Sequence, residues 1–245
     1  MFAGPNGSGK SVLKSYLSSK LLGVYLNPDE IQKDIETTGT LDFSSFGVRA
    51  LGEEVLSFFH DSELLRKESL QGEALRLGFI DGELDFSRVS VNAYFAAVAV
   101  DFLRRKLIER KMDFTFETVM SHPGKVELLA EARSKGYRTY LYYVATDDPQ
   151  INISRVQNRV ATGGHDVPVE KIEERYHKSL ALLMNAIANT DRAYIFDNST
   201  DSARGEQTWL AEITGGKELE FKSKQIRAWF KQAVLDKGWR QSGVL

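Results

Sequence analysis

Eight residues near the start of the sequence form a glycine-rich pattern that binds phosphate in many proteins. The pattern G-x-x-x-x-G-K-[ST] is satisfied by Gly4-Pro5-Asn6-Gly7-Ser8-Gly9-Lys10-Ser11. Glycines let consecutive backbone N–H groups turn inward around a phosphate, and a helix opening after them adds its dipole. Lys10 would bring positive charge to the β- and γ-phosphates, and the Ser11 hydroxyl would bind Mg²⁺. The loop therefore predicts binding of ATP or GTP with Mg²⁺; the alternative is a glycine-rich linker before a helix.

Two carboxylates follow predicted strands, at the sheet edge where open α/β folds bind ligands. Asp29 comes after the apolar run 24–26, and Glu117 ends the run 114–117. Asp29 could take the proton of an attacking hydroxyl as a general base, or it could be a carboxylate favoured by a helix dipole. Glu117 could bind acceptor hydroxyls or a Mg²⁺-bound water, or it could be a solvated strand end.

Basic side chains and a glycine-containing loop resemble the lid of a kinase. Arg155 and Arg159 are one helical turn apart, and the loop 162–168 follows them. Such arginines supply charge to a phosphoryl transition state, and such a loop can close over substrates; the alternative is a solvated basic helix face. Arg175 is a further candidate. His165 is expected to shape the lid or contact phosphate, since no second histidine at ligand spacing supports a metal role.

Strands alternate with helices along most of the chain. Predicted strands are 24–26, 114–117, 137–145 and 193–196, and predicted helices are 12–21, one from a Ser90 cap through Arg110, 148–160 and 169–187. The tail adds a strand from Thr208 and a helix carrying Ile226, Trp229, Phe230 and Ala233. This order predicts an α/β fold of the P-loop kinase type, a mainly parallel sheet flanked by helices in three layers.

Two predicted strands each allow two interpretations. Only Met1–Ala3 precede the loop, so the first strand is very short or upstream residues are missing. Asp197 ends an apolar strand, either as the nearest candidate for the acidic strand end of transporter-type ATPases or as part of an ordinary turn.

Composition limits the classes of partner. The chain has 245 residues, 42% apolar and 27% charged, with a net charge of −2. We therefore expect no general attraction to nucleic acid or to acidic membranes, and no apolar run is long enough to span a bilayer. The absence of cysteine and of a visible signal peptide fits the cytoplasm. We expect a kinase domain over 1–200, with a helical insertion at about 41–90, and a C-terminal extension over 201–245 packed on the core.

These motifs together resemble the zeta-toxin family of P-loop kinases, in particular a branch often labelled as putative ATPases. The shared segments are Ala3–Ser11, Asn27–Ile31, Phe116–Ser121, Arg155-Val156 to Arg159-Val160, Gly163–Pro168, Arg175-Tyr176 and Phe196–Ser199. They span residues 3–199 in one order. The segment 41–90 and the tail beyond Thr200 lie outside the resemblance.

The resemblance implies a kinase that transfers the γ-phosphate of ATP to a sugar hydroxyl of UDP-N-acetylglucosamine, with a small antitoxin protein blocking the ATP site. By position, the resemblance implies that Lys10 is the phosphate-binding lysine and Asp29 the general base. Arg155 and Arg159 would be the cations that stabilise the transition state. The residues that would contact the acceptor or other substrate groups are Glu117, Thr118, His165 and Arg175. The well-studied toxins have a His-Pro pair shortly after the aspartate, whereas this chain has Ile31-Gln32-Lys33-Asp34-Ile35.

Other functions remain open from the sequence. The chain could be an ATP-driven switch with a protein partner, hydrolysing ATP without a small-molecule acceptor. It could also be a nucleotide-binding module without catalysis. Transfer of labelled phosphate to an acceptor distinguishes the kinase from both.

Overall fold

The computed structural model describes residues 1–164, 166–200 and 207–238. Contacts divide the chain into two compact units, one formed by Met1–Ser18 with Glu117–Leu245 and the other by Ser19–Phe116. Each unit is described by itself. Within the described ranges, no helix combines the length and the apolarity needed to cross a bilayer.

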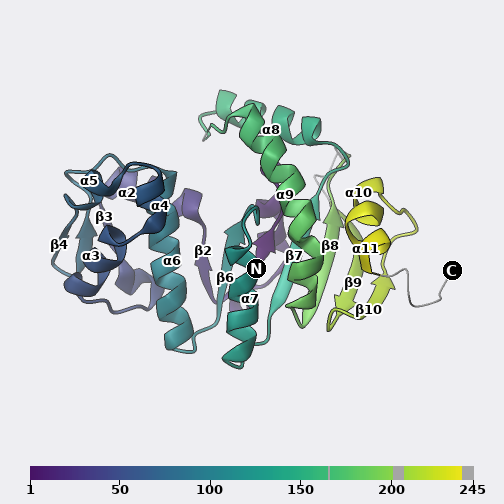
Figure 1. Ribbon diagram of the computed structural model, residues 1–245, viewed down its shortest axis with the longest axis horizontal. Helices are drawn as coiled ribbons and strands as arrows, with labels where there is room; N and C mark the ends of the chain where they lie inside the picture. Colours follow the sequence, from purple (N-terminus) through teal and green to yellow (C-terminus); the bar gives the residue numbers. More distant parts are fainter. Residues whose placement is uncertain (165, 201–206, 239–245) are drawn as a thin grey trace. The chain divides into compact units, whose positions relative to one another are not determined.

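The first unit is built on a mainly parallel sheet (Figure 1). Its strands, in spatial order, are β10 (Glu218–Phe221), β9 (Thr208–Thr214), β8 (Arg192–Asp197), β7 (Tyr140–Ala145), β1 (Phe2–Ala3) and the last two residues of β6 (Phe114–Thr118). Strands β8, β7, β1 and β6 are parallel, and β9 and β10 add an antiparallel edge. The predicted α/β class with a mainly parallel sheet is therefore confirmed.

The short first strand lies in the middle of this sheet. Phe2 and Ala3 are fully buried, and Phe2 pairs with Glu117 on one side and Tyr142 on the other. Pairing on both sides satisfies the backbone polar groups that burial removes from water. Strand β1 therefore leads directly to the sheet edge where Gly4 begins.

Helices and a C-terminal segment pack around this sheet. They are α7 (Gly124–Ser134), α8 (Pro149–Ala161), α9 (Val169–Ala188), α10 (Ala228–Phe230), the π-helical turn η3 (Lys231–Leu235) and α11 (Asp236–Gly238). In Figure 1, α9 crosses in front of β7 and β8. The hydroxyls of Tyr143 on β7 and Ser179 on α9 are 3.0 Å apart and both buried. Ile153, Val156 and Ile172 form an apolar core between α8 and α9, with Val160 and Val167 against it.

The second unit combines a parallel strand pair with a small antiparallel sheet. Its elements are α1 (Ser19–Leu22), β2 (Val24–Leu26), α2 (Pro28–Thr38), β3 (Thr40–Asp42), η2 (Phe43–Phe46), α3 (Gly52–His60), α4 (Glu63–Lys67), α5 (Gln71–Ala74), β4 (Gly78–Ile80), β5 (Glu83–Asp85) and α6 (Ala93–Glu109). Strand β2 pairs in parallel with Phe114–Phe116 of β6, and β3, β5 and β4 form the small sheet. Aromatic contacts join α3 to α6, where the Phe59 and Phe95 rings stack at 6.5 Å.

The helix predicted over 12–21 is wrong. A 3₁₀ helix, η1, runs from Lys10 to Tyr16, and α1 begins only at Ser19. A 3₁₀ helix has three residues per turn, so residues four apart do not share a face. Leu13 is buried, whereas Val12 is 37%, Tyr16 42% and Leu21 69% exposed. These apolar side chains therefore do not form one buried face.

Two smaller predictions also differ from the structure. Asn92, not Ser90, caps α6, because its side-chain oxygen accepts from the backbone N–H of Tyr94 and of Phe95. Ile226 is 53% exposed and precedes α10 instead of lying within the helix. Both differences arise within two or three residues of an element boundary, where capping contacts decide the outcome.

The hydroxyl pair between β7 and α9 leads to a stability prediction. Tyr143→Phe should lower the free energy of unfolding by about 1 kcal/mol, because it leaves the buried Ser179 hydroxyl without that partner. The double change Tyr143→Phe/Ser179→Ala should cost less than the sum of the two single changes. Denaturant unfolding of the four proteins measures this, and strictly additive costs would show that the pair does not interact.

Candidate functional site

The phosphate loop Gly4–Ser11 follows β1 and folds tightly against its neighbours. Gly4 has a φ of 147°, and a Cβ there would lie 2.0 Å from the Val144 carbonyl oxygen. Gly7 has a φ of 70°, and a Cβ there would lie 2.5 Å from the Asn152 carbonyl oxygen. Real Cβ atoms do not approach backbone oxygens this closely, and side chains also disfavour these φ values. Both positions therefore require glycine.

Three side-chain amides brace the loop by donating hydrogen bonds to its backbone carbonyl oxygens. The hydrogen bonds run from Asn152 Nδ2 to Asn6 O, from Asn198 Nδ2 to Ser8 O at 2.9 Å, and from Gln207 Nε2 to Gly9 O at 2.7 Å. In a trans peptide, the N–H points opposite to the C=O. The N–H groups that follow these carbonyls, at Gly7, Gly9 and Lys10, are therefore directed away from the bracing side chains. This is the arrangement that backbone binding of a phosphate requires.

The side chains of Ser8 and Lys10 show that the loop can accommodate a phosphate group. Ser8 is fully buried, and its Oγ has no hydrogen-bond partner among the described residues. A buried hydroxyl without a partner is costly, and a phosphate oxygen could accept from it. Lys10 Nζ donates to Gly4 O at 3.0 Å and Pro5 O at 2.9 Å, so its ammonium group lies over the loop. These features fit a nucleotide phosphate.

The carboxylate candidate Glu117 lies beside the strand that leads into the loop. Glu117 is opposite Phe2, and Thr118 is opposite Ala3 in the parallel pairing of β1 with β6. Both strands therefore end at the same sheet edge, and Glu117 is 8% exposed. Thr118 Oγ1 accepts from the backbone N–H of Met120, which is fully buried with a φ of 54°. Such a conformation costs a non-glycine residue about 1–3 kcal/mol, so the loop after Glu117 is strained.

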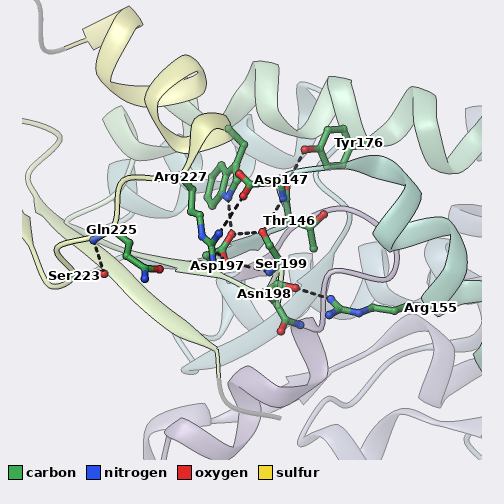
Figure 2. A network of polar contacts seen from close by, with 11 residues as sticks. Thr146, Asp147, Arg155, Tyr176, Asp197, Asn198, Ser199, Ser223, Gln225 and Arg227 are labelled. Carbon is green, nitrogen blue, oxygen red and sulfur yellow. Dashed lines mark hydrogen bonds and ion pairs between the residues drawn. The ribbon is translucent and has the colours of Figure 1, made fainter. Parts of the chain in front are cut away.

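Arg155 is joined to the phosphate loop through one residue. Asp148 caps α8, because its Oδ1 accepts from the backbone N–H of Gln150 at 2.8 Å. Two turns later, half-buried Arg155 donates from NH1 to Asn198 O at 2.7 Å (Figure 2). Asn198 also bonds Ser8 O, so the structure brings Arg155 and the loop into one hydrogen-bonded frame.

The other basic candidates are Arg159, Arg175 and His165. Arg159 is exposed on α8, and Gly164 packs on its side chain and donates to its carbonyl oxygen at 2.9 Å. Arg175 is half-buried on α9. His165 lies outside the described residues. The roles given to these three residues stay predictions.

Asp29 belongs to the second unit. It is exposed in the first turn of α2, where Asn27 Oδ1 accepts from its backbone N–H at 2.9 Å. Pro28 supplies the preset φ of a first helical residue. This local setting suits both a dipole-stabilised carboxylate and a general base, and its placement beside the phosphate loop stays a prediction.

Sequence reasoning missed Asn152 and Gln207. Thr146 Oγ1 bonds Asn152 Oδ1, and Tyr176 OH donates to Thr146 O at 2.6 Å, so the end of β7, α8 and α9 are tied together. Burial raises the pKa of Tyr176, and the charges of nearby aspartates add to the effect, so its hydroxyl stays a donor. An asparagine on a helix and a glutamine before a strand follow no distinctive spacing, so no signal in the sequence could have found them.

Comparison with known proteins gives one family match. The model of a family described as zeta toxin matches residues 85–210, just over half of the chain. The matched segment includes Glu117, Arg155 and Arg159, and it begins after the phosphate loop and Asp29. A Haemophilus influenzae protein described as uncharacterized is 26% identical over 69 residues, which are 28% of this chain and 49% of that protein.

Solved structures with a similar fold are complexes titled AvrRxo1-ORF1:-ORF2. The one with ATP has a TM-score of 0.50 and 13% identity, and the match covers 90% of this chain and 60% of that chain. The native complex has a TM-score of 0.54 and 13% identity, with 96% and 64% covered. Identities this low show a shared fold. The chain spans about half of its Haemophilus relative and less than two thirds of these structures.

The crowding at Gly7 leads to a second prediction. Gly7→Ala should weaken binding of an ATP analogue at least about tenfold, because the new methyl group displaces the loop from Asn152. Gly72→Ala is the matched control, since nothing lies within 4 Å of a Cβ at this exposed helical glycine. Titration calorimetry measures the affinities and thermal unfolding checks the fold. Unchanged affinity in Gly7→Ala would contradict the close packing of the loop.

Proposed function

This chain belongs to the zeta toxin family, and from that membership we propose that it transfers the γ-phosphate of ATP to a hydroxyl of a small molecule. The observation that carries the proposal is the braced phosphate loop. The bracing side chains bond its carbonyls at Asn6, Ser8 and Gly9, so the N–H groups that follow these carbonyls point the other way, as backbone binding of a phosphate requires. The family match and the shared fold with an ATP-containing complex support the same function.

The proposed roles of the residues follow from their charge and position. The loop amides and Lys10 bind the β- and γ-phosphates, and Arg155, with Arg159 after lid closure, stabilises charge that develops on the transferred phosphoryl group. Ser11 would hold Mg²⁺, which neutralises phosphate charge when it is bound. Because the net charge of the chain is −2, phosphate affinity must come from this local arrangement.

The acceptor side of the site uses carboxylates in this proposal. Asp29 accepts the proton of the attacking hydroxyl, and Glu117 with Thr118 binds the acceptor beside the phosphate loop. Arg175 and His165 contact the substrates from α9 and the lid. A nucleotide-linked sugar such as UDP-N-acetylglucosamine is the acceptor that membership of the family suggests. We propose that the kinase domain spans 1–200 with an insertion at about 41–90, and that 201–245 forms an extension packed on the core.

A small protein partner is also part of the proposal. The similar structures contain AvrRxo1-ORF1 together with ORF2, so their fold is compatible with a bound second protein. We propose that an antitoxin-like protein controls access to the nucleotide in the cytoplasm. A protein-regulated ATPase without a small-molecule acceptor is the alternative that the following experiment distinguishes.

A transfer assay tests the proposed function. With γ-labelled ATP, Mg²⁺ and a panel of UDP-sugars, nucleosides and free sugars, label should appear on one acceptor. Lys10→Ala should lower kcat/KM at least about a hundredfold, since it removes the charge on the phosphates. Lys14→Ala, on the exposed side of η1, is the matched control and should retain the parent rate. Label released only as free phosphate would instead support the ATPase.

The assignment of the general base has its own test. Asp29→Asn should lower kcat roughly 10²–10⁴-fold, because the amide cannot accept the hydroxyl proton, while KM for ATP stays near the parent value. Glu30→Gln, the neighbouring carboxylate in the same helical turn, should leave kcat unchanged. Full transfer activity in Asp29→Asn would remove Asp29 from the mechanism without affecting the phosphate loop.

A further inference from the structure

Asn198 occupies a junction between the phosphate loop and Arg155. Its backbone N–H donates to Ala145 O at 2.8 Å, its carbonyl oxygen accepts from Arg155 NH1 at 2.7 Å, and its Nδ2 donates to Ser8 O at 2.9 Å. One residue thus contacts the end of β7, the arginine of α8 and the loop. A shift of Asn198 would move a phosphate-binding peptide and the guanidinium together.

The conformation of this junction is fixed by its neighbours in the chain. Asp197 Oδ2 accepts from the backbone N–H of Ser199 at 3.1 Å, and Asp197 Oδ1 accepts from the Ser199 hydroxyl at 2.6 Å. Ser199 Oγ in turn accepts from the backbone N–H of Asp147 at 2.8 Å. These bonds close a turn around Asn198 and attach it to the segment after β7.

The C-terminal segment holds Asp197 from the other side (Figure 2). Asp197 is 1% exposed, and a carboxylate this buried needs partners for its charge. Arg227 Nε lies 3.0 Å from Asp197 Oδ2, and Trp229 Nε1 donates to Oδ1 at 2.9 Å. Arg227 also pairs with Asp147 at 3.3 Å. Both residues come from a segment about thirty positions further along the chain, which otherwise has no part in the proposed chemistry.

We propose that Asn198 is a positioning residue for the phosphate loop and Arg155, and that Arg227 and Trp229 set its position through Asp197. The C-terminal segment thereby controls the geometry of phosphoryl transfer without touching a substrate. This inference rests on the proposed function for its kinetic consequence. Its structural consequence, the order of the loop, is independent of any activity.

Amide hydrogen exchange of the nucleotide-free chain tests the structural consequence. Asn198→Ala and Arg227→Gln should each accelerate exchange in the peptide containing Gly7–Val12 by about fivefold or more, the factor expected for one lost hydrogen bond. Arg227→Lys should restore part of the protection, since it keeps the charge. Arg192→Gln is the matched control, because Arg192 pairs with Glu212 at 3.0 Å at the opposite end of β8, and it should leave the loop unchanged.

Kinetics test the consequence for catalysis. Asn198→Ala keeps the backbone oxygen that receives Arg155, so it should mainly raise KM for ATP, about tenfold. Arg227→Gln should change both parameters, raising KM and lowering kcat, because it disturbs the loop and Arg155 together. A merely structural role would reduce the amount of folded protein and leave both parameters of the folded fraction unchanged.

The outcomes separate this inference from the proposed function. Parent-like loop exchange in folded Asn198→Ala or folded Arg227→Gln overturns the inference. If Arg227→Gln does not fold, the inference is tested by the loop hydrogen exchange and the kinetic parameters of Asn198→Ala and Arg227→Lys. If the parent transfers phosphate to no acceptor, the proposed function fails, and the exchange data alone decide whether Asn198 positions the loop.

Discussion

Binding a phosphate with backbone amides requires that several peptide planes be held with their N–H groups on one side. In this chain, side-chain amides bond the opposite carbonyls at Asn6, Ser8 and Gly9. A loop of small residues has little rigidity of its own, because glycine leaves many conformations accessible. The bracing contacts supply the rigidity, so the ability to bind phosphate depends on segments that lie far from the loop in sequence.

The sheet explains why those segments meet. Strand β1 lies between β6 and β7, so the segments after three parallel strands emerge at one edge beside the phosphate loop. Glu117 and Thr118 end β6 at this edge. Asn152 lies on α8, the helix that follows β7, and contacts the loop at Asn6. Asn198 follows β8 directly. The sheet topology therefore brings polar residues from three segments to the sheet edge at which the phosphate loop begins.

The buried Asp197 adds a second layer to this arrangement. A carboxylate without solvent is stable only with charged and hydrogen-bonding partners, here Arg227, Trp229 and Ser199. Removing one partner of such a pair typically costs about 3–5 kcal/mol. The cost makes the C-terminal segment part of the folded unit that carries the site. The contacts of Asp197 therefore stabilise the same folded unit that contains the phosphate loop.

The phosphate loop, the main strands, helices α8 and α9 and the family could all be predicted from the amino-acid sequence, because they depend on local spacing and on motifs in a fixed order. Other features depend on contacts that form only in the folded chain. The loop is followed by a 3₁₀ turn instead of the expected helix, and Asn92 replaces Ser90 as a cap. Asn152, Gln207 and Arg227 serve the site through contacts spanning 146, 198 and 30 positions, the last being the separation of Arg227 from Asp197. Local periodicity carries no information on such pairs, since they form only when the sheet brings distant segments within hydrogen-bonding distance.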